Sequence, residues 1–565
     1  MPPALHRFEQ AGKRYALDPE TCFCFECDAI SWDVIDLYPH TPMNRIVHLL
    51  RDRHPVKEIE EVIGELEWLR ASKSILSPPT HDQIPKLFEI ERGLKRVVVF
   101  LPDDGESRKT SRWMRKKSGG AFDPAILFQA AELLLVRSGD QKELCLECVA
   151  SQTMLAAPEL AEACTGILKK GGMAGKKMSV AFRVDAAERI DGHRVGVCLT
   201  FDAGAEVARP LRALAETNLL RLGKPAKVLQ SNDAGVQGHL VIRPGHARFH
   251  ETVREAEQAG FNHIEIESDG TFIEEPELDP ADLLEGMRQT AVYYAERLLK
   301  HHYFRLDPIA PLFWRIYNGM PLRRSDPAAV NELAVDARGT IYPSRWWMQP
   351  AHACGNLSDS RMNDSALTHF EDIGAMTTPA CLRCWARNLC GGGCAAVHQA
   401  RSGSMRTPHA PWCDAQRNWM QSAVAAFSLL SAQGVNFTRV YSALNQTARP
   451  SLFALVRTAF RMNIGIRPLE EADADWLTQW ENWNEAAYFA CHESSLLMAT
   501  KYDREMDSLH PAGYEQEFIL LHKNGQPMGL LKVRPGAMAG CAQTWLYFRD
   551  PASYADASVR SSFRA

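Results

Sequence analysis

The sequence of 565 residues has no run of about 20 apolar residues, the length that a membrane-spanning helix requires. It also has no excess of positive charge, since 64 Lys and Arg stand against 69 Asp and Glu and the formal net charge is -5. Nucleic-acid-binding proteins are usually basic. We therefore expect a chain that neither crosses a membrane nor binds nucleic acid.

Residues 1–18 lack the apolar core of a signal peptide. We therefore expect a cytoplasmic protein, in which thiols stay reduced. In that compartment the 15 cysteines are expected to be metal ligands and buried thiols, not disulfides.

The length predicts several domains. Residues 7–30 alternate like short strands, residues 43–54 and 56–72 have helical spacing, and a Pro-containing linker follows at 77–83. The sequence therefore predicts a small β-then-α module at 1–77.

From residue 95 onward, strand and helix patterns alternate, which predicts an α/β fold with a parallel sheet flanked by helices, either an open sheet or a partial barrel. A further compact α/β unit is expected at 460–565. The predicted strands of the large sheet are 95–102, 142–149, 176–184, 194–202, 238–244 and 263–268.

Cysteines gather in one segment with the spacing CX2CX5CX3C, and a further cysteine follows downstream. The x2 spacing lets two thiolates converge on one site across a tight turn. The glycines at 391–393 let the backbone pass close to a bulky cluster without a Cβ clash, and they free N–H groups to bond its sulfurs. The residues are Cys381, Cys384, Cys390, Cys394 and Cys413.

Ligation by cysteine alone suits zinc or an iron–sulfur cluster. Zinc ribbons tend to pair two x2 knuckles, whereas this segment has one, between Cys381 and Cys384. The spacing therefore favours an iron–sulfur cluster. Zinc and a core of free thiols stay open as alternatives.

This cysteine pattern resembles the SPASM domain of radical SAM peptide maturases. The stretch CWARNLCGGGCAA is similar to enzymes that modify Cys-rich peptides or the cross-linked subunit of quinohemoprotein amine dehydrogenase. Residues 331–347 and 354–357 resemble neighbouring stretches of that family. The resemblance implies a PqqD-like peptide-recognition module at 1–77, a radical-SAM-like partial barrel at 90–325 and a SPASM iron–sulfur segment at 326–425.

The resemblance also implies the ligands of one auxiliary-type [4Fe-4S] cluster: Cys381, Cys384, Cys390 and Cys413. Cys394 is then a plain thiol, or it pairs with Cys354 in a rebuilt site. The position of one further family ligand is occupied by Ser344.

The SAM-binding motif of the family, CX3CX2C after the first barrel strand, is absent, because residues 103–120 contain no cysteine. The family's GGEP is replaced by residues 149–152, and Cys22, Cys24 and Cys27 have the wrong spacing and are interpreted as strand residues. We therefore expect no SAM binding. The basic loop at 108–117 is interpreted as a solvated loop or as a docking surface for an acidic partner.

Residues 460–565 resemble a truncated GNAT acetyltransferase without its Gly-rich CoA turn. The resemblances together imply a degenerate maturase: a non-catalytic subunit that binds a substrate peptide or protein and pairs with an active radical SAM maturase. Two alternatives stay open. One is an enzyme of another class, with acyl or acetyl transfer by the C-terminal unit or a repurposed barrel pocket. The other is an electron-transfer protein.

Overall fold

The computed structural model describes most of the first 440 residues and four strands beyond them. Its helices contain no segment long and apolar enough to cross a membrane within that described part of the chain. The described residues are 5–71, 75–76, 93–101, 122–186, 188–229, 235–274, 280–318, 322–359, 362–433, 435, 437, 440, 465–468, 516–521, 527–535 and 542–548.

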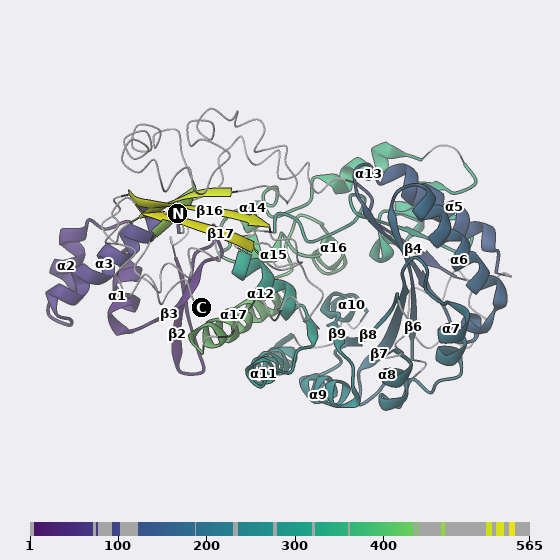
Figure 1. Cartoon of the computed structure of the whole chain (residues 1–565), viewed down its shortest axis with the longest axis horizontal. Helices are drawn as coiled ribbons and strands as arrows, with labels where there is room; N and C mark the ends of the chain where they lie inside the picture. Colours follow the sequence, from purple (N-terminus) through teal and green to yellow (C-terminus); the bar gives the residue numbers. More distant parts are fainter. Residues whose placement is uncertain are drawn as a thin grey trace. The chain divides into compact units, whose positions relative to one another are not determined.

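The chain forms two compact units (Figure 1). One consists mainly of Pro79–Phe313 and Leu322–Val435, and the other of Pro3–Pro78, Trp314–Pro321 and Asn436–Ala565. The predicted linker 77–83 and the basic loop 108–117 lie outside the described residues, so their interpretation stays a prediction.

The N-terminal module has the predicted order of strands followed by helices. Its antiparallel sheet has the order β1-β2-β3, so β1 and β3 are the edge strands and β2 is central. The elements are β1 His6–Gln10, β2 Lys13–Leu17, β3 Cys24–Cys27, α1 Ala29–Leu37, α2 Met43–Leu50 and α3 Val56–Ala71.

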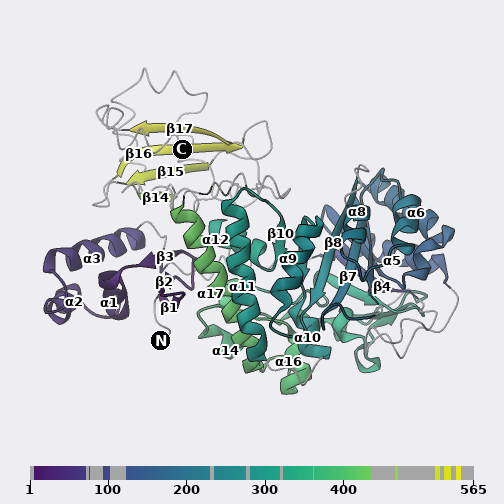
Figure 2. The same ribbon diagram turned by 90° about the horizontal axis from the view of Figure 1, so that it is seen from below.

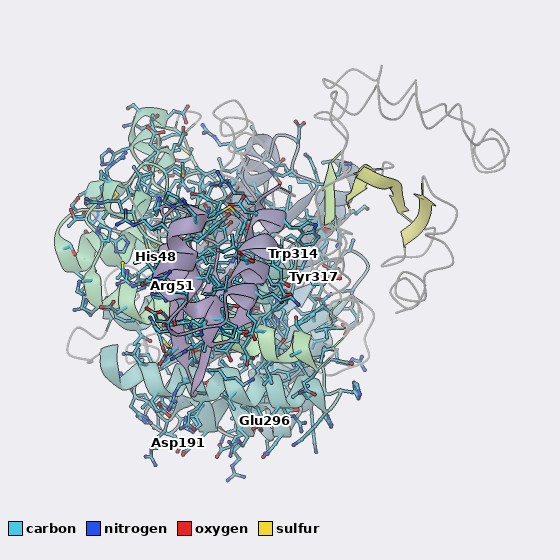
Figure 3. The ribbon with its side chains drawn as sticks, turned by 90° about the vertical axis from the view of Figure 1, so that its left-hand side faces the viewer. His48, Arg51, Asp191, Glu296, Trp314 and Tyr317 are labelled. Atoms are coloured by element: carbon cyan, nitrogen blue, oxygen red, sulfur yellow. The ribbon has the colours of Figure 1, made fainter. Side chains whose placement is uncertain are left out.

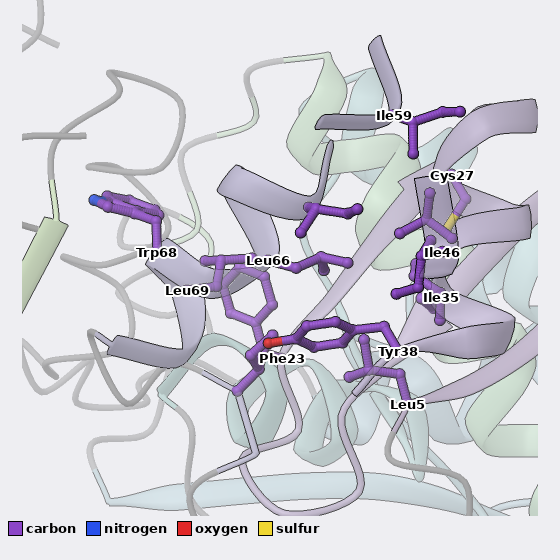
Figure 4. Close-up of a cluster of buried hydrophobic side chains, with 14 of the residues drawn as sticks. Leu5, Phe23, Cys27, Ile35, Tyr38, Ile46, Ile59, Leu66, Trp68 and Leu69 are labelled. Atoms are coloured by element: carbon purple, nitrogen blue, oxygen red, sulfur yellow. The ribbon is translucent and has the colours of Figure 1, made fainter. Parts of the chain in front are cut away.

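Apolar side chains from the sheet and the three helices form one core (Figure 4). Asp28 caps α1, because its side chain accepts a hydrogen bond from the Ser31 N–H. His48 and Arg51, in and directly after α2, are labelled in Figure 3. The core includes Leu5, Phe23, Cys27, Ile35, Tyr38, Ile46, Ile59, Leu66 and Leu69.

The buried carboxylate of Asp18 joins the two ends of this module. It accepts hydrogen bonds from the Thr21 hydroxyl at 2.8 Å and from the Leu76 N–H at 2.9 Å. Burial raises the pKa of Asp18 to about 6, although these hydrogen bonds act to lower it. The residue that follows β2 therefore holds the chain that follows α3.

The three N-terminal cysteines are all buried. Cys24 and Cys27 lie in β3, as predicted, but Cys22 precedes the strand with a φ of 61°. The interpretation of Cys22 as a strand residue is therefore wrong. Its N–H instead bonds the Asp18 carbonyl at 2.9 Å and closes the turn that leads into β3.

The larger unit is built on a ten-stranded sheet that contains all six strands predicted for it. Its strand order is β10-β9-β8-β7-β6-β5-β4-β11-β12-β13. The strands are β4 Arg96–Phe100, β5 Glu143–Val149, β6 Lys177–Asp185, β7 Arg194–Phe201, β8 Val236–Arg243, β9 His263–Ile266, β10 Arg305–Asp307, β11 Glu332–Val335, β12 Thr340–Tyr342 and β13 Gly355–Asn356.

The sheet is mostly parallel, in agreement with the predicted α/β class, but β7 is antiparallel to both β6 and β8. The prediction of a parallel sheet is therefore wrong at this strand. Only residues 186–193 connect β6 to β7, which is too short for the crossover that parallel neighbours need. Asp191 in this connection is exposed and is labelled in Figure 3.

Helices follow most of the strands, and Figure 2 shows α11 and α17 side by side. The Asn418 side chain on α17 donates to the Leu284 carbonyl on α11 at 3.0 Å. The helices before the cysteine segment are α5 Pro124–Arg137, α6 Pro158–Met173, α7 Ala208–Ala215, α8 Gly223–Leu229, α9 Phe249–Ala259, α10 Ser268–Glu274, α11 Pro280–Leu299 and α12 Ile309–Asn318, with the short 3-10 helices η3 Thr153–Ala156, η4 Arg345–Trp347 and η5 Pro350–His352.

Short helices carry the cysteine segment. They are α13 Asp364–Glu371, α14 Pro379–Leu382, α15 Arg387–Cys390, α16 Ala395–Ser402 and the longer α17 Ala410–Ala432.

The described part of the C-terminal region is an antiparallel sheet with the order β14-β15-β16-β17. Its strands β15 and β16 pair antiparallel, with Phe518 opposite Leu531. The strands are β14 Gly465–Pro468, β15 Gln516–Leu521, β16 Pro527–Pro535 and β17 Ala542–Phe548.

Candidate metal centre

The four predicted ligands come from three helices and one turn. Cys381 lies in α14, Cys384 follows that helix, Cys390 ends α15, and Cys413 lies in the first turn of α17. The Cys384 N–H bonds the Cys381 carbonyl at 2.9 Å and closes the turn between the first two. The x2 spacing therefore forms the tight turn that the sequence predicts.

These four thiols lie within electrostatic reach of one another. Burial raises the pKa of Cys390, and Cys413, Cys381 and Cys384 raise it further. Burial also raises the pKa of Cys413 to about 11, with Cys381 and Cys384 again among its neighbours. The structure thus brings together residues that are up to 32 positions apart in the sequence, from Cys381 to Cys413.

The three glycines at 391–393 all have left-handed backbones, with φ of 68°, 94° and 79°. A Cβ on Gly392 would lie 2.5 Å from the Ala375 nitrogen, and one on Gly393 would lie 2.5 Å from the Trp412 ring. The space beside these two glycines is filled by the protein itself, so the interpretation that it makes room for a cluster is wrong there. The Gly392 N–H bonds the Cys390 sulfur and counteracts the rise in its pKa, whereas bonding to cluster sulfurs stays a prediction.

Residues 322–326 pack along the glycine turn and fix it. The Ser325 N–H and hydroxyl donate to the carbonyls of Gly391 at 3.1 Å and Gly393 at 2.7 Å. The Asp326 carboxylate accepts from the Ala395 N–H at 2.7 Å, at the start of α16. Side-chain and backbone hydrogen bonds therefore hold the segment from two sides.

The remaining candidate thiols have acceptors of their own. Cys394 bonds the Asp269 carboxylate, and burial together with Asp269 and Asp326 raises its pKa well above the usual value. The Cys354 sulfur donates to the Ile341 carbonyl at 3.3 Å. Joint ligation by Cys394 and Cys354 stays a prediction.

Ser344, at the position of a further family ligand, has a structural role at the start of a short helix. It precedes η4, and its hydroxyl accepts a hydrogen bond from the Trp346 N–H at 3.3 Å. This contact caps the short helix.

Sequence reasoning missed Arg417, which lies one turn after Cys413 on α17. Its guanidinium bonds the Cys384 sulfur and donates to the Asp414 carboxylate at 2.5 Å. It also acts against the burial that raises the pKa of Cys381. The i, i+4 spacing from Cys413 was the signal available in the sequence.

No three His, Cys, Asp or Glu side chains are arranged to hold a single metal ion in the described part of the chain. A four-iron cluster distributes its thiolates over different irons, so its ligands do not surround one point. The four thiols are all cysteine, which is the donor set that such a cluster takes. The chemistry of the residues therefore fits the cluster.

A second feature that sequence reasoning missed is a network of charges, which joins strands of the large sheet to Arg345 in η4 and is buried except at Arg96, whose side chain is 45% exposed. Glu267 receives both guanidinium nitrogens of Arg183 at 2.9 Å and also pairs with Arg243. The network consists of Arg96, Arg183, Arg243, Arg345, Glu147, Asp185, Glu267 and Glu332.

The network balances four positive against four negative side chains. Burial alone would raise the pKa of Glu147, but Arg345, Arg96 and Arg183 hold it down to about 2. Opposite charges therefore keep the carboxylate ionised in a buried position. Charged residues at alternate positions of apolar strands, such as Arg183 and Asp185 in β6, were the signal in the sequence.

Two histidine–carboxylate pairs lie on β8, β9 and β10. The His239 and His263 rings stack with their centroids 4.4 Å apart. His239 Nε2 lies 3.3 Å from a Glu265 oxygen, and His263 Nε2 lies 3.4 Å from an Asp307 oxygen. Their side chains are partly exposed, in contrast to the buried charge network.

No family model matches the chain, and no curated protein matches it. Among solved structures it is similar to His6-tagged anSMEcpe with bound AdoMet, with 14% identity over 62% of this chain and 98% of that chain and a TM-score of 0.43. It is also similar to Streptococcus suis SuiB bound to S-adenosylmethionine, with 12% identity over 72% of this chain and 97% of that chain and a TM-score of 0.33. SuiB bound to its precursor peptide SuiA gives 12% identity and a TM-score of 0.28 over the same shares. These TM-scores lie below 0.5, so the likeness assigns this chain neither a family nor a function.

Proposed function

We propose that the chain is an iron–sulfur protein that acts in the maturation of a ribosomally made peptide or protein. In this proposal it holds one [4Fe-4S] cluster, binds the substrate and serves as a non-catalytic partner of an active radical SAM enzyme. The observation that carries the proposal is the convergence of Cys381, Cys384, Cys390 and Cys413.

Four thiolates would occupy every iron of such a cluster and leave no coordination site for a substrate or for SAM. When bound, the cluster would stabilise the fold of the cysteine segment and carry one electron. The chain's own contribution is to position the sulfurs, through the Cys381–Cys384 turn and the start of α17, and to donate the Gly392 N–H to Cys390.

The buried charge network supports the non-catalytic part of the proposal. Its charges are equal in number and already paired, so it stabilises the sheet without a ligand. Arg183 and Glu147 have side chains that are only 5% and 7% exposed, which leaves them little contact with solvent or with a bound molecule. We therefore interpret this part of the sheet as a core and not as a cofactor pocket.

The edge strands of the N-terminal module support peptide binding. An extended peptide can add to an exposed sheet edge through backbone hydrogen bonds, which tolerate a varied sequence. Among the described strands of this sheet β2 is central and β3 lies at one side of it. We propose that β3 receives the substrate.

Anaerobically prepared protein should be brown and contain about four irons and four acid-labile sulfides per chain. Replacing Cys384 or Cys390 by alanine should bleach the protein and destabilise residues 326–425, because cluster binding contributes to folding. Iron and sulfide analysis and visible absorption measure this. Cys394→Ala is the matched control and should retain the iron, because that thiol bonds Asp269. Zinc in place of iron would contradict the proposal.

The partner role predicts a stable complex with an intact radical SAM protein, burying well over about 1,000 Å². Deleting residues 1–77 should weaken peptide binding but leave that complex intact, because the deletion removes β3 and its module. Size-exclusion chromatography and fluorescence anisotropy with a labelled peptide separate the two effects. A chain that stays monomeric with every candidate partner and binds no candidate peptide would rule out the role.

The histidine–carboxylate pairs favour one alternative, an enzyme that uses a repurposed barrel pocket. His239 with Glu265, and His263 with Asp307, are partly exposed pairs of the kind used in general acid–base catalysis. Turnover by the isolated chain, abolished by His263→Gln, would favour this alternative. Acetyl transfer by residues 460–565 has no such observation in its support.

A further inference from the structure

We propose that Arg417 raises the reduction potential of the metal centre by acting as a fixed positive charge beside its ligands. This inference rests on the proposed cluster and adds a role for a residue that is not itself a ligand. In this role Arg417 sets the reduction potential at which the centre takes up an electron, whereas the proposed function needs the centre only to stabilise the fold.

The helix α17 determines where this charge lies. Cys413 and Arg417 are four residues apart on that helix, so both side chains project from one face. The Arg417 guanidinium reaches the sulfur of Cys384, a ligand from a different element. The charge of Arg417 therefore lies beside Cys384 and on the same helix as Cys413.

The charge is held in place on its other side by Asp414. The guanidinium donates to that carboxylate at 2.5 Å, and the two side chains are 34% and 63% exposed. Arg417 is thus the more shielded of the pair, and Asp414 the more solvated. The positive charge acts on the sulfurs with less screening by water than the negative charge that opposes it.

A second arginine in the cysteine segment, Arg387, bonds backbone carbonyls. Arg387 is buried, and its guanidinium donates to the carbonyls of Leu382 at 3.5 Å and Cys384 at 3.4 Å. These bonds satisfy carbonyl groups at the Cys381–Cys384 turn and so shape the turn. Arg417 differs because it bonds the Cys384 sulfur itself.

The sign of the effect follows from Coulomb's law. Reduction takes one electron from an external donor, here an electrode, and adds one negative charge to the centre. A neighbouring positive charge stabilises the reduced form more than the oxidised form. Removing Arg417 must therefore make the centre harder to reduce, and removing Asp414 must make it easier.

The test is voltammetry of the full-length protein after anaerobic reconstitution, with iron counted in each sample. Arg417→Gln should shift the reduction equilibrium about tenfold toward the oxidised form, which is about 59 mV to a more negative potential for one electron. Asp414→Asn should shift it in the opposite direction. Arg417→Lys should retain most of the wild-type value, because the charge is kept.

Lys177→Gln is the control for a general loss of positive charge. Lys177 lies at the start of β6 in an exposed pair with Glu143, and its removal should leave the potential unchanged. A change of the same size in this variant would overturn the inference.

The outcomes separate the inference from the proposed function. If the wild type binds no iron, the proposed cluster is wrong, and the inference falls with it. If all variants bind iron and their potentials coincide, the inference alone is wrong. If Arg417→Gln cannot hold iron, the potentials of Asp414→Asn and Arg417→Lys test the inference instead. A failure of Asp414→Asn to raise the potential would then overturn it.

Discussion

Replacing Gly392 by alanine should destabilise the cysteine segment by about 3 kcal/mol or more. A left-handed alanine costs about 1–2 kcal/mol by itself, and overpacking of a filled space adds about 1–3 kcal/mol. The new methyl group would lie 2.5 Å from the Ala375 nitrogen and 2.6 Å from the Gly374 carbonyl carbon, which are both backbone atoms that cannot rotate away. Hydrogen-exchange mass spectrometry across residues 322–402 should show the loss as faster exchange.

Gly403→Ala is the matched control for the strain of the left-handed backbone. Gly403 has a φ of 74° and ends α16, but a Cβ there would meet no atom within 4 Å. We expect this variant to cost only the strain of a left-handed alanine, about 1–2 kcal/mol. Equal costs for the two glycines would mean that the close packing around Gly392 contributes nothing.

Replacing Glu267 by alanine should lower the free energy of unfolding of the large sheet by about 3–5 kcal/mol, the usual cost of leaving buried charges without their partner. The change removes the bidentate partner of Arg183 and the partner of Arg243, and both arginines stay buried. The midpoint of urea unfolding, followed by circular dichroism, measures the effect. Glu267→Gln keeps the size of the side chain and should lower the free energy of unfolding by less than Glu267→Ala does.

Glu143→Ala is the control for this prediction. Glu143 pairs with Lys177 in the same sheet, but the two side chains are 77% and 65% exposed. Exposed ion pairs contribute about 0–1 kcal/mol. If Glu267→Ala cost no more than Glu143→Ala, the buried network would not stabilise the sheet.

The sequence predicted the features that depend on local patterns. The apolar runs gave six strands of the large sheet, and the x2 spacing gave the turn between Cys381 and Cys384. It also identified four cysteines that the fold brings within electrostatic reach.

Features that depend on pairing between distant segments could not be predicted in this way. Arg183 and Glu267 are 84 residues apart, and their contact exists only once the strand order is known. The packing of Gly392 on Ala375 is equally invisible in a local pattern. The direction of β7 depends on whether the chain after β6 forms a hairpin or a crossover, and the alternation of apolar residues is the same in both cases.

The hydrogen bond between Asp18 and Leu76 gives the N-terminal module a mechanical property. Tension applied to the chain at residue 76 is transmitted through the Leu76 N–H to Asp18, which directly follows the central strand β2. Part of the load therefore reaches the end of the central strand directly, and the rest passes to α3 through the backbone and the hydrogen bond from the Ile75 N–H to the Leu69 carbonyl. The buried side chain of Ile75, next to this contact, resists the same pull. The contact thus gives a force on residue 76 a second path into the module, between two residues that are 58 positions apart.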